Sequence, residues 1–361
     1  MEQNDTLTGM LDLMMRPAFS VKDSSIAYVN RAAKAYMLAE GMPVSQILVT
    51  GSDEYSEFSD GCLYLTVSVC NCPCGASVTR MGEFDVFILE PENDRAELQG
   101  MALAAQELRL PLAKVMTVAD KLFPLLEDDS DARSGEQLAQ INRGLFQMLR
   151  IVSNMSDAYQ YSQLSTGNQE VIDVRDYLEE LFRSAAVLAQ HAEITLHFRN
   201  VNTPVYCLAD PVKLERAVHN ILSNAIKYTP KGGTIAASLS RRGNMLYLTV
   251  QDSGSHVAAD LRGSIFSRYQ RSPEIEEGRN GIGLGMVLIR SIAAMHGGTV
   301  LLEYPENSGT RITMTMAIRQ NTDSLVRSPV FRVDYAGERD HRLLEFADVL
   351  PSTLYRTNKI N

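Results

Sequence analysis

The pattern of apolar and polar positions divides the chain into segments with different periods. Up to about residue 90, apolar and β-branched side chains gather in short runs such as Leu63–Val69 and Asp85–Leu89, a bias that is typical of β-strands. Short helical signals lie between these runs. The pattern therefore predicts a small mixed α/β domain over residues 1–92.

Beyond the turn signal Pro91–Asp94, the apolar period becomes helical. One run continues to Phe123–Pro124, and a second covers Leu138–Met155. The acidic stretch Glu127–Asp131 reads as a loop, so the two runs predict an antiparallel helical hairpin over residues 93–168. A single hairpin buries too little apolar surface to be stable alone, and pairing with a second copy in a four-helix bundle would complete it.

Helical and strand signals alternate again over residues 169–319, with glycine turns such as Lys231–Gly233, which predicts a mixed α/β domain. Residues 320–361 are mostly polar and hold one short amphipathic piece, Leu343–Ala347. The role of this tail stays open between packing on the preceding domain, binding a partner and remaining mobile. The fold class is therefore α+β with several domains, as expected for 361 residues, because single cores rarely exceed about 250 residues.

Composition excludes several classes of protein. A net charge of −10 leaves no basic surplus to neutralise phosphates, so a general nucleic-acid binder is not expected. The longest uncharged stretch, Gly61–Thr79, contains Asn71 and Pro73, so no membrane span is expected. The first residues carry neither a basic region nor a long apolar core, which argues against a secretory signal. Five cysteines, an odd number, then favour a reducing cytoplasm over a disulfide scaffold.

The most specific chemical signal lies on a predicted helix over Asn220–Tyr228. Asn220, Asn224 and Lys227 fall at i, i+4 and i+7, so they share one stripe beside an apolar stripe that would face the core. An amide oxygen is a hard ligand for Mg²⁺, and a lysine is a point charge for phosphate. The trio suits a magnesium nucleotide, although its spacing alone equally allows a solvated helix face.

Two further motifs follow this helix. Asp252-Ser253-Gly254 comes after the predicted strand Leu246–Val250, where a carboxylate can accept a hydrogen bond from an exocyclic amine, although such a tripeptide is more often only a turn. Gly281, Gly283 and Gly285 alternate before a helix, which lets backbone N–H groups approach a phosphate at the positive end of the helix dipole. Each motif is weak alone, but the three in this order predict a nucleotide site.

With these motifs the chain resembles the GHKL ATP-binding superfamily, and within it the sensor histidine kinases, over residues 95–318. The matching segments are Asn220–Tyr228 for the N box, Asp252–Gly254 for the first glycine box, Ile265–Arg271 for the F box and Gly281–Gly285 for the second glycine box. The resemblance implies an α/β sandwich that holds ATP and Mg²⁺ under a mobile lid, here Ser272–Asn280.

The resemblance also assigns roles to single residues. The ATP-binding positions would be Asn220, Asn224, Lys227, Tyr228, Asp252, Gly254, Arg271, Gly281, Gly283 and Gly285. Among them Asn220 would help to hold Mg²⁺, Asp252 would accept from the adenine amine, and Arg271 would lie near the γ-phosphate. The other N-box residues would face the phosphates. One departure is His256, which stands where the first glycine box usually has a second glycine and either strains the loop or is a tolerated surface change.

A second departure removes the nucleophile. The family's first long helix carries a histidine followed by Glu-Leu-Arg and usually Thr-Pro-Leu, whereas this chain reads Gln106-Glu107-Leu108-Arg109-Leu110-Pro111-Leu112. Glu107 retains the position that polarises the histidine, but the amide nitrogen of Gln106 has a delocalised lone pair and cannot attack phosphorus. Leu110 replaces a polar residue that can position a hydrolytic water. Autophosphorylation here, and phosphatase activity by that route, are therefore not expected, and the remaining histidines lie off this hairpin.

Residues 1–92 weakly resemble a PAS-type sensor domain. Ala18–Asp23 and Ile26–Ala33 look like its opening hairpin and first helix. The signal that such a domain would sense is not readable from the residues.

The cysteines Cys62, Cys70, Cys72 and Cys74 lie close together in this segment. Alternate residues of a strand share a face, so Cys70 and Cys72 could converge. A C-x-C-x-C spacing is not the C-x-x-C of common zinc sites, so ordinary cysteines outweigh a metal or redox site.

Two kinds of function follow from the sequence. As an enzyme, the protein would hydrolyse ATP or pass the γ-phosphoryl group to a Ser, Thr or His of another protein. As a regulatory module, ATP and a sensor ligand would set the shape of a homodimeric scaffold that binds a response regulator or a partner kinase. Gln106 with Leu110 favours the module, or a kinase acting in trans, over self-phosphorylation.

Overall fold

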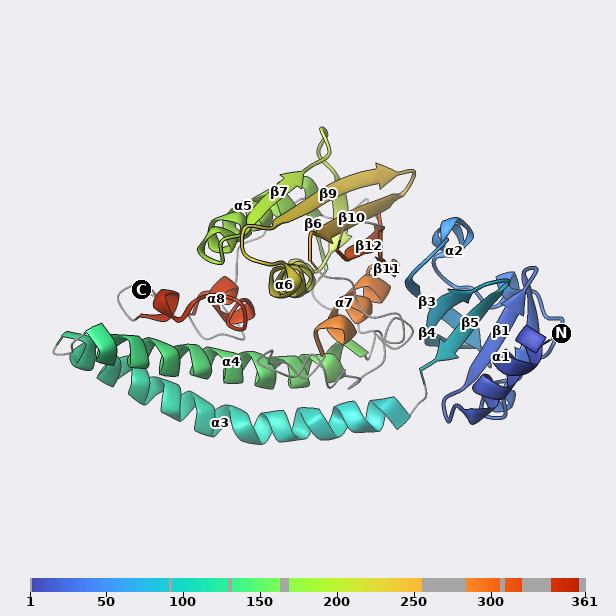
Figure 1. The fold of residues 1–361 in the computed structure, drawn as a ribbon, viewed down its shortest axis with the longest axis horizontal. Coiled ribbons are helices and arrows are strands. Elements are labelled where there is room, and N and C mark those ends of the chain that lie inside the picture. The colour runs from blue at the N-terminus through green and yellow to red at the C-terminus, as the bar shows by residue number, and fades with distance from the viewer. Residues whose placement is uncertain are drawn as a thin grey trace.

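The computed structural model describes seven stretches of the chain, residues 2–90, 93–128, 132–162, 169–254, 284–305, 309–319 and 339–356. Figure 1 shows an N-terminal α/β part, two long helices, and a larger α/β part that lies over these helices. A short C-terminal segment returns to the helices. Within the seven stretches, no helix is long and apolar enough to cross a membrane.

The N-terminal part begins with helix α1 (Glu2–Leu13) and builds antiparallel strands in the order β2-β1-β5-β4-β3. The strands are β1 (Ala18–Lys22), β2 (Ser25–Val29), β3 (Cys62–Val69), β4 (Cys72–Met81) and β5 (Phe84–Leu89). Between β2 and β3 lie η1 (Ala33–Tyr36), η2 (Val44–Gln46) and α2 (Ser52–Glu57). The alternating apolar side chains of the strands fill a core of their own, in which Phe19 and Phe87 stack with ring centroids 4.8 Å apart.

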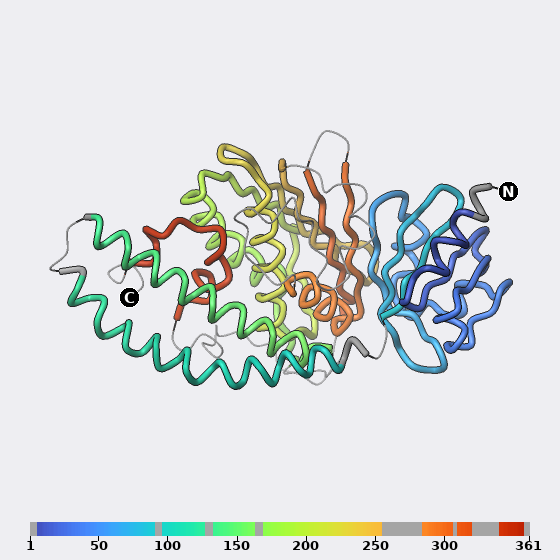
Figure 2. The backbone as a smooth tube through the Cα atoms, turned by 60° about the horizontal axis from the view of Figure 1, so that its bottom comes forward, coloured from blue at the N-terminus to red at the C-terminus, as the bar shows by residue number. Residues whose placement is uncertain are grey.

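The two helical runs form α3 (Asn93–Asp128) and α4 (Ala132–Ser162), which lie side by side (Figures 1 and 2). The predicted end of the first helix at Phe123–Pro124 is wrong, because α3 continues to Asp128 and includes the first acids of the predicted loop. A proline removes only one N–H donor from a helix, and α3 contains both Pro111 and Pro124. A helix of this length tolerates that loss while its other hydrogen bonds and its packing on α4 persist.

The larger α/β part places helices over a mixed sheet (Figure 1). Its helices are α5 (Val174–His191), α6 (Pro211–Tyr228) and α7 (Leu284–Met295). Its strands are β6 (Glu170–Asp173), β7 (Thr195–Arg199), β8 (Tyr206–Ala209), β9 (Thr234–Arg242), β10 (Met245–Asp252), β11 (Val300–Glu303) and β12 (Arg311–Ala317). The main sheet runs β11-β12-β10-β9-β7, while β6 and β8 form a separate pair. Apolar faces of the helices and sheet close the main core, as expected for two packed layers.

The two sheets join edge to edge into one sheet of ten strands. Strand β3 pairs with β11 in antiparallel register, with Leu63 opposite Leu301. The close approach depends on Gly61, which has a φ of +96°, because a β-carbon there would overlap the carbonyl oxygen of Leu302. A β-carbon on Gly51 would lie 2.5 Å from the Cγ2 of Thr299. The N-terminal part is therefore fixed to the larger part by backbone pairing as well as by the chain connection.

The C-terminal segment contains helix α8 (His341–Glu345) and the 3-10 helix η5 (Ser352–Tyr355). Of the three roles left open for the tail, residues 339–356 pack on the rest of the chain, along α4 and against α6 (Figures 1 and 2). The predicted amphipathic piece Leu343–Ala347 supplies buried side chains at this contact.

Candidate nucleotide site

Local sequence signals mark both ends of helix α6. Asp210 caps its first turn by accepting from the backbone N–H of Lys213 at 3.2 Å, and Pro211 occupies the first helical position. The imidazole Nε2 of His296 accepts from the backbone N–H of Asp210 at 3.1 Å, which ties this end to the end of α7. The helix ends at Thr229, before Pro230. Its predicted polar stripe is therefore held on a helix anchored at both ends.

Asn220 is buried on α6, with 1% of its surface exposed, and it faces the start of α7. Its Nδ2 donates to the backbone carbonyl of Arg216 at 2.8 Å, which fixes the amide so that Oδ1 points the other way. A β-carbon on Gly285 would lie 2.9 Å from that Oδ1. The carboxamide oxygen of Asn220, a hard ligand, is thus held beside the last glycine of the predicted phosphate loop.

The other end of α6 meets the end of β10. Gly254 lies so close to Tyr228 that a β-carbon there would overlap the tyrosine's carbonyl oxygen. Asp252, 6% exposed, accepts through Oδ1 from the backbone N–H of Gly254 at 2.8 Å and of Thr310 at 3.1 Å. These bonds fix the carboxylate. The structure therefore brings together the predicted site residues of α6, β10 and the start of α7.

Three of the predicted site residues on α6 are more exposed than Asn220 and Asp252. Asn224, Lys227 and Tyr228 are partly buried, and the Nζ of Lys227 lies 5.9 Å from the centroid of the Tyr228 ring. The spacing argument for one shared stripe agrees with their position on α6. Arg271, Gly281 and Gly283, together with His256 and the expected lid, lie outside the described residues, so their roles remain predictions.

Two buried histidines make stability depend on pH in this region. Burial lowers the pKa of His219 and of His296 below the usual 6.5, and for His219 burial outweighs the opposing carboxylates of Glu215 and Glu345. Because the unfolded chain then binds protons that the folded chain does not, stability is full above pH 6.5 and falls as the pH drops below it.

We expect each histidine to lower the free energy of unfolding by about 1.4 kcal/mol per pH unit below 6.5, until its folded pKa is reached. Urea unfolding at pH 7.5 and 5.5 measures this change. His219→Leu should show a smaller pH dependence than the wild type. An equal pH dependence in wild type and His219→Leu would contradict the assignment.

Comparisons with known proteins agree with this geometry. Residues 209–320 match the family of histidine kinase-, DNA gyrase B- and HSP90-like ATPases. Hybrid signal transduction histidine kinase D of Dictyostelium discoideum is 26% identical over 273 residues, which are 70% of this chain and 17% of that protein. Sensor protein QseC of Salmonella typhimurium is 33% identical over 201 residues, which are 55% of this chain and 42% of that protein. The chain is similar to sensor histidine kinases, and its residues 209–320 match the ATPase family that these kinases share.

Further similar proteins match in the same way. Sensor histidine kinase CusS of Escherichia coli is 26% identical over 218 residues, which are 59% of this chain and 44% of that protein. The chain thus spans less than half the length of each of these three relatives. The crystal structure of full-length ShkA in complex with AMPPNP covers 62% of this chain and 47% of its own, at 22% identity and a TM-score of 0.48. Domains of the matched family bind ATP, usually with Mg²⁺.

The positions that correspond to the phosphoacceptor motif of sensor histidine kinases lie on the exposed side of α3, next to the buried Ala105. Gln106 and Glu107 are both exposed on α3. A side chain at position 106 is therefore accessible to a partner. Exposure does not make the amide nitrogen of Gln106 nucleophilic.

One expectation about the cysteines is wrong. Cys70 and Asn71 both have positive φ, 53° and 60°, and form the turn between β3 and β4. The chain reverses there, so Cys70 and Cys72 do not alternate along one strand. A two-residue turn with two positive φ angles matches the twist of the flanking strands, which explains why the chain turns at this point. No group of three or more metal-binding side chains is found among the described residues.

Sequence reasoning missed a polar contact between α7 and the N-terminal part. Arg290, 3% exposed, forms an ion pair with Glu90 at the end of β5. Its guanidinium lies 4.9 Å from the centroid of the Tyr64 ring, and the Tyr64 hydroxyl donates to Glu90 at 2.8 Å. Arg290 lies 200 positions from Glu90 and further still from Tyr64, and no local pattern links it to them. The available signal in the sequence was Arg290 itself, a charged residue within the otherwise apolar helix α7.

Proposed function

We propose that this chain is an ATP-binding signal-transduction protein that does not phosphorylate itself at the usual position. The observation that carries the proposal is the placement of Asn220. Its carboxamide oxygen is oriented by the bond to Arg216 and lies beside Gly285, where a nucleotide's magnesium and phosphates would bind. Asp252, fixed at the other end of the same helix, supplies an acceptor for an exocyclic amine.

The nucleotide would act as a switch for a scaffold. The joined sheet and the Arg290–Glu90 pair connect the nucleotide region to the N-terminal part, so occupancy of one part can bias the other. Gln106 removes phosphate chemistry at the family's position. The scaffold would regulate a response regulator or a partner kinase. A kinase that transfers phosphate to a Ser, Thr or His of another protein is the alternative.

The N-terminal part supports a PAS-like sensor, because it is an antiparallel sheet with short helices between its second and third strands. The helical pair supports a homodimer. It leaves large apolar side chains exposed, among them Leu110 at 64%, Val118 at 61% and Leu125 at 67%. Such a stripe on a pair of helices is covered in a four-helix bundle. Sedimentation of the purified chain as a monomer would contradict the dimer.

The test is calorimetric titration of the purified chain with MgATP, followed by incubation with γ-labelled ATP. We expect the wild type to bind nucleotide and to carry no acid-labile label. Asn220→Ala should weaken binding at least about tenfold, because a hydrogen bond or ligand to a charged group contributes roughly 1.5–3 kcal/mol. The matched control is Asn202→Ala, an exposed asparagine outside the site, which should leave affinity unchanged.

The outcomes separate the alternatives. An Asn220→Ala variant with unchanged affinity would contradict the site. Label that is transferred only when a partner protein is added would favour the kinase acting in trans. Bound ATP without transfer to any partner would favour the scaffold.

A further inference from the structure

Residues 339–356, which we call the C-terminal clamp, are built into the core of the chain. Leu344, Phe346, Ala347 and Tyr355 have no exposed surface, and Leu350 is 1% exposed. The ring of Phe346 lies 5.3 Å from that of His219 on α6, and the ring of Tyr355 lies 5.3 Å from that of Phe146 on α4. The clamp therefore packs against both helices with apolar side chains.

One face of α4 carries a row of donors for the clamp backbone. Asn142 donates through Nδ2 to the carbonyl of Tyr355 at 2.8 Å. Further along, Arg143 donates to the carbonyl of Leu350 and Gln147 to that of Ala347, each at 3.2 Å. Backbone carbonyls of a short irregular segment need such partners when they are buried. Side chains of α4 thus supply hydrogen-bond donors for the backbone carbonyls of the clamp.

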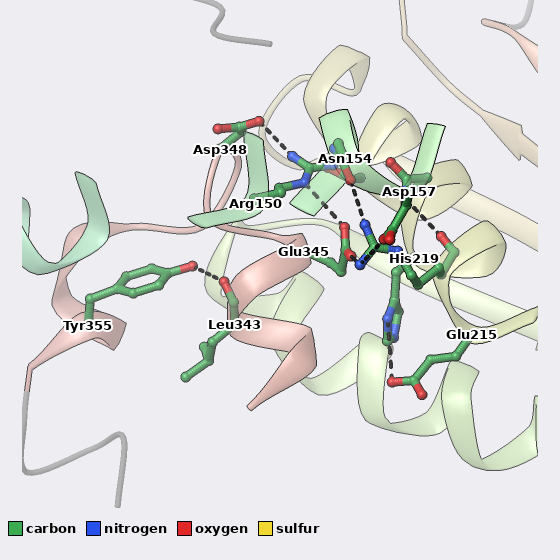
Figure 3. Close-up of polar contacts among 12 residues, drawn as sticks. Arg150, Asn154, Asp157, Glu215, His219, Leu343, Glu345, Asp348 and Tyr355 are labelled. Carbon is green, nitrogen blue, oxygen red and sulfur yellow. Dashed lines mark hydrogen bonds and ion pairs between the residues drawn. The ribbon is translucent and has the colours of Figure 1, made fainter. Parts of the chain in front are cut away.

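A buried group of charges joins the clamp to α4 and α6 (Figure 3). Glu345 of the clamp is fully buried and lies between two arginines, with Oε2 3.2 Å from Arg150 on α4 and Oε1 3.7 Å from Arg216 on α6. Asp348 of the clamp pairs with Arg150 at 2.6 Å. From α4, Asp157 pairs with Arg216 at 3.0 Å. Figure 3 shows Arg150 between Asp348 and Glu345.

The clamp supplies two of the three carboxylates in this group, and both carboxylates that pair with Arg150 belong to the clamp. With Glu345 and Asp348 in place, two buried cations face three carboxylates. Removing one partner of a buried ion pair leaves an uncompensated charge, so the contact between α4 and α6 depends on the docked clamp.

The same group holds the turn of α6 that carries Asn220. The carbonyl of Arg216, whose side chain pairs with Glu345, accepts from the amide of Asn220 at 2.8 Å. One turn further on, Ser223 accepts from the Nη2 of Arg150 at 3.2 Å. Asn220 thus lies between two α6 residues that the charge group engages.

We propose that docking of the C-terminal clamp and binding of nucleotide at α6 are thermodynamically coupled. The docked clamp holds α6 with Asn220 oriented toward Gly285, and bound nucleotide in turn keeps the clamp docked. The coupling is reciprocal, because each event favours the same arrangement of α6. This inference rests on the proposed nucleotide site and names its regulation: the clamp adjusts the affinity of the site through its contacts with α6.

The test uses the full chain with a reporter on the clamp. The protein contains no tryptophan, so Leu354→Trp, at a partly buried clamp position, adds one tryptophan that can be excited selectively over the tyrosines and whose emission shifts to the red when the clamp is released. Glu345→Gln keeps the size of the side chain and removes its charge. Asp348→Asn, at the edge of the group, is a milder variant in case Glu345→Gln does not fold. Arg342→Ala is the matched control, because Arg342 pairs with Asp340 inside the clamp.

Titration with Mg²⁺ and the analogue AMPPNP gives the affinity in each background. We expect Glu345→Gln to shift emission to the red and to weaken AMPPNP binding about tenfold, within the usual 5- to 150-fold range of coupling. Asp348→Asn should change both in the same direction but less, and Arg342→Ala should change neither. Release of the clamp in either acidic-residue variant with unchanged affinity would overturn the coupling. A wild type that shows a docked clamp but binds no AMPPNP would instead overturn the proposed nucleotide site.

Discussion

Gly61→Ala is expected to lower the free energy of unfolding by roughly 2–5 kcal/mol, from about 1–2 kcal/mol of left-handed backbone strain and about 1–3 kcal/mol of overpacking. The position has a φ of +96°, and a β-carbon there would overlap the carbonyl oxygen of Leu302. That atom belongs to the backbone of β11, so it cannot rotate away. Relief requires β11 to move from β3, which breaks the pairing that joins the two sheets.

Gly82→Ala is the matched control for this effect. Gly82 also has a positive φ, +63°, but a β-carbon there would meet nothing within 4 Å. It should therefore show the strain of about 1–2 kcal/mol without the clash. Chemical unfolding of both variants measures the difference. Equal losses in the two variants would mean that the contact between Gly61 and β11 contributes nothing to stability.

Gln106→His is expected to give the chain an acid-labile phosphoryl label that the wild type lacks altogether. A neutral imidazole offers a lone pair to phosphorus, and Glu107 is retained beside it to polarise the ring. Position 106 is exposed on α3, so an imidazole there is accessible to the nucleotide region of the same chain or of a second copy. The measurement is incubation with γ-labelled ATP and Mg²⁺ under acid and alkaline quenching.

The control for this gain is the double variant Gln106→His with Asn220→Ala, which should carry much less label at the same ATP concentration because its affinity for the nucleotide is lower. Acid-labile label on the wild type would show that another histidine accepts phosphate and would contradict the role assigned to Gln106. A Gln106→His variant that binds nucleotide yet stays unlabelled would show that the donor site itself is not competent for transfer.

Local sequence patterns predicted much of the fold of this chain. The helical periods predicted α3 and α4, and the helix expected over Asn220–Tyr228 is the second half of α6, which begins earlier, at Pro211. The resemblance to sensor histidine kinases is confirmed by the matched ATPase family. The roles of the individual site residues stay predictions. The structure places Asn220 of α6 beside Gly285, and Asp252 at the end of β10 beside Gly254, which meets the last residue of α6.

Apart from the end of α3 and the turn at Cys70 and Asn71, the parts that escaped prediction are long-range. Strand β11 has only four residues, Val300–Glu303, and nothing in such a run names β3 as its partner. The bond between Arg150 and Glu345 links positions 195 residues apart. From the sequence alone, Arg150 and Glu345 would both be taken as exposed residues, because charged residues are seldom buried unless they are paired. Pairing of this kind is decided by tertiary packing and leaves no local period to read.

The shared sheet has a practical consequence for the separated halves of the molecule. In the whole chain, β3 and β11 cover each other's open hydrogen-bonding edges. A fragment that lacks the N-terminal part would present β11 as a bare edge, and a bare edge is a template for strand addition by another chain. Self-association of such a fragment would then result from the exposed edge of β11. The oligomeric state of the fragment would not represent that of the intact protein.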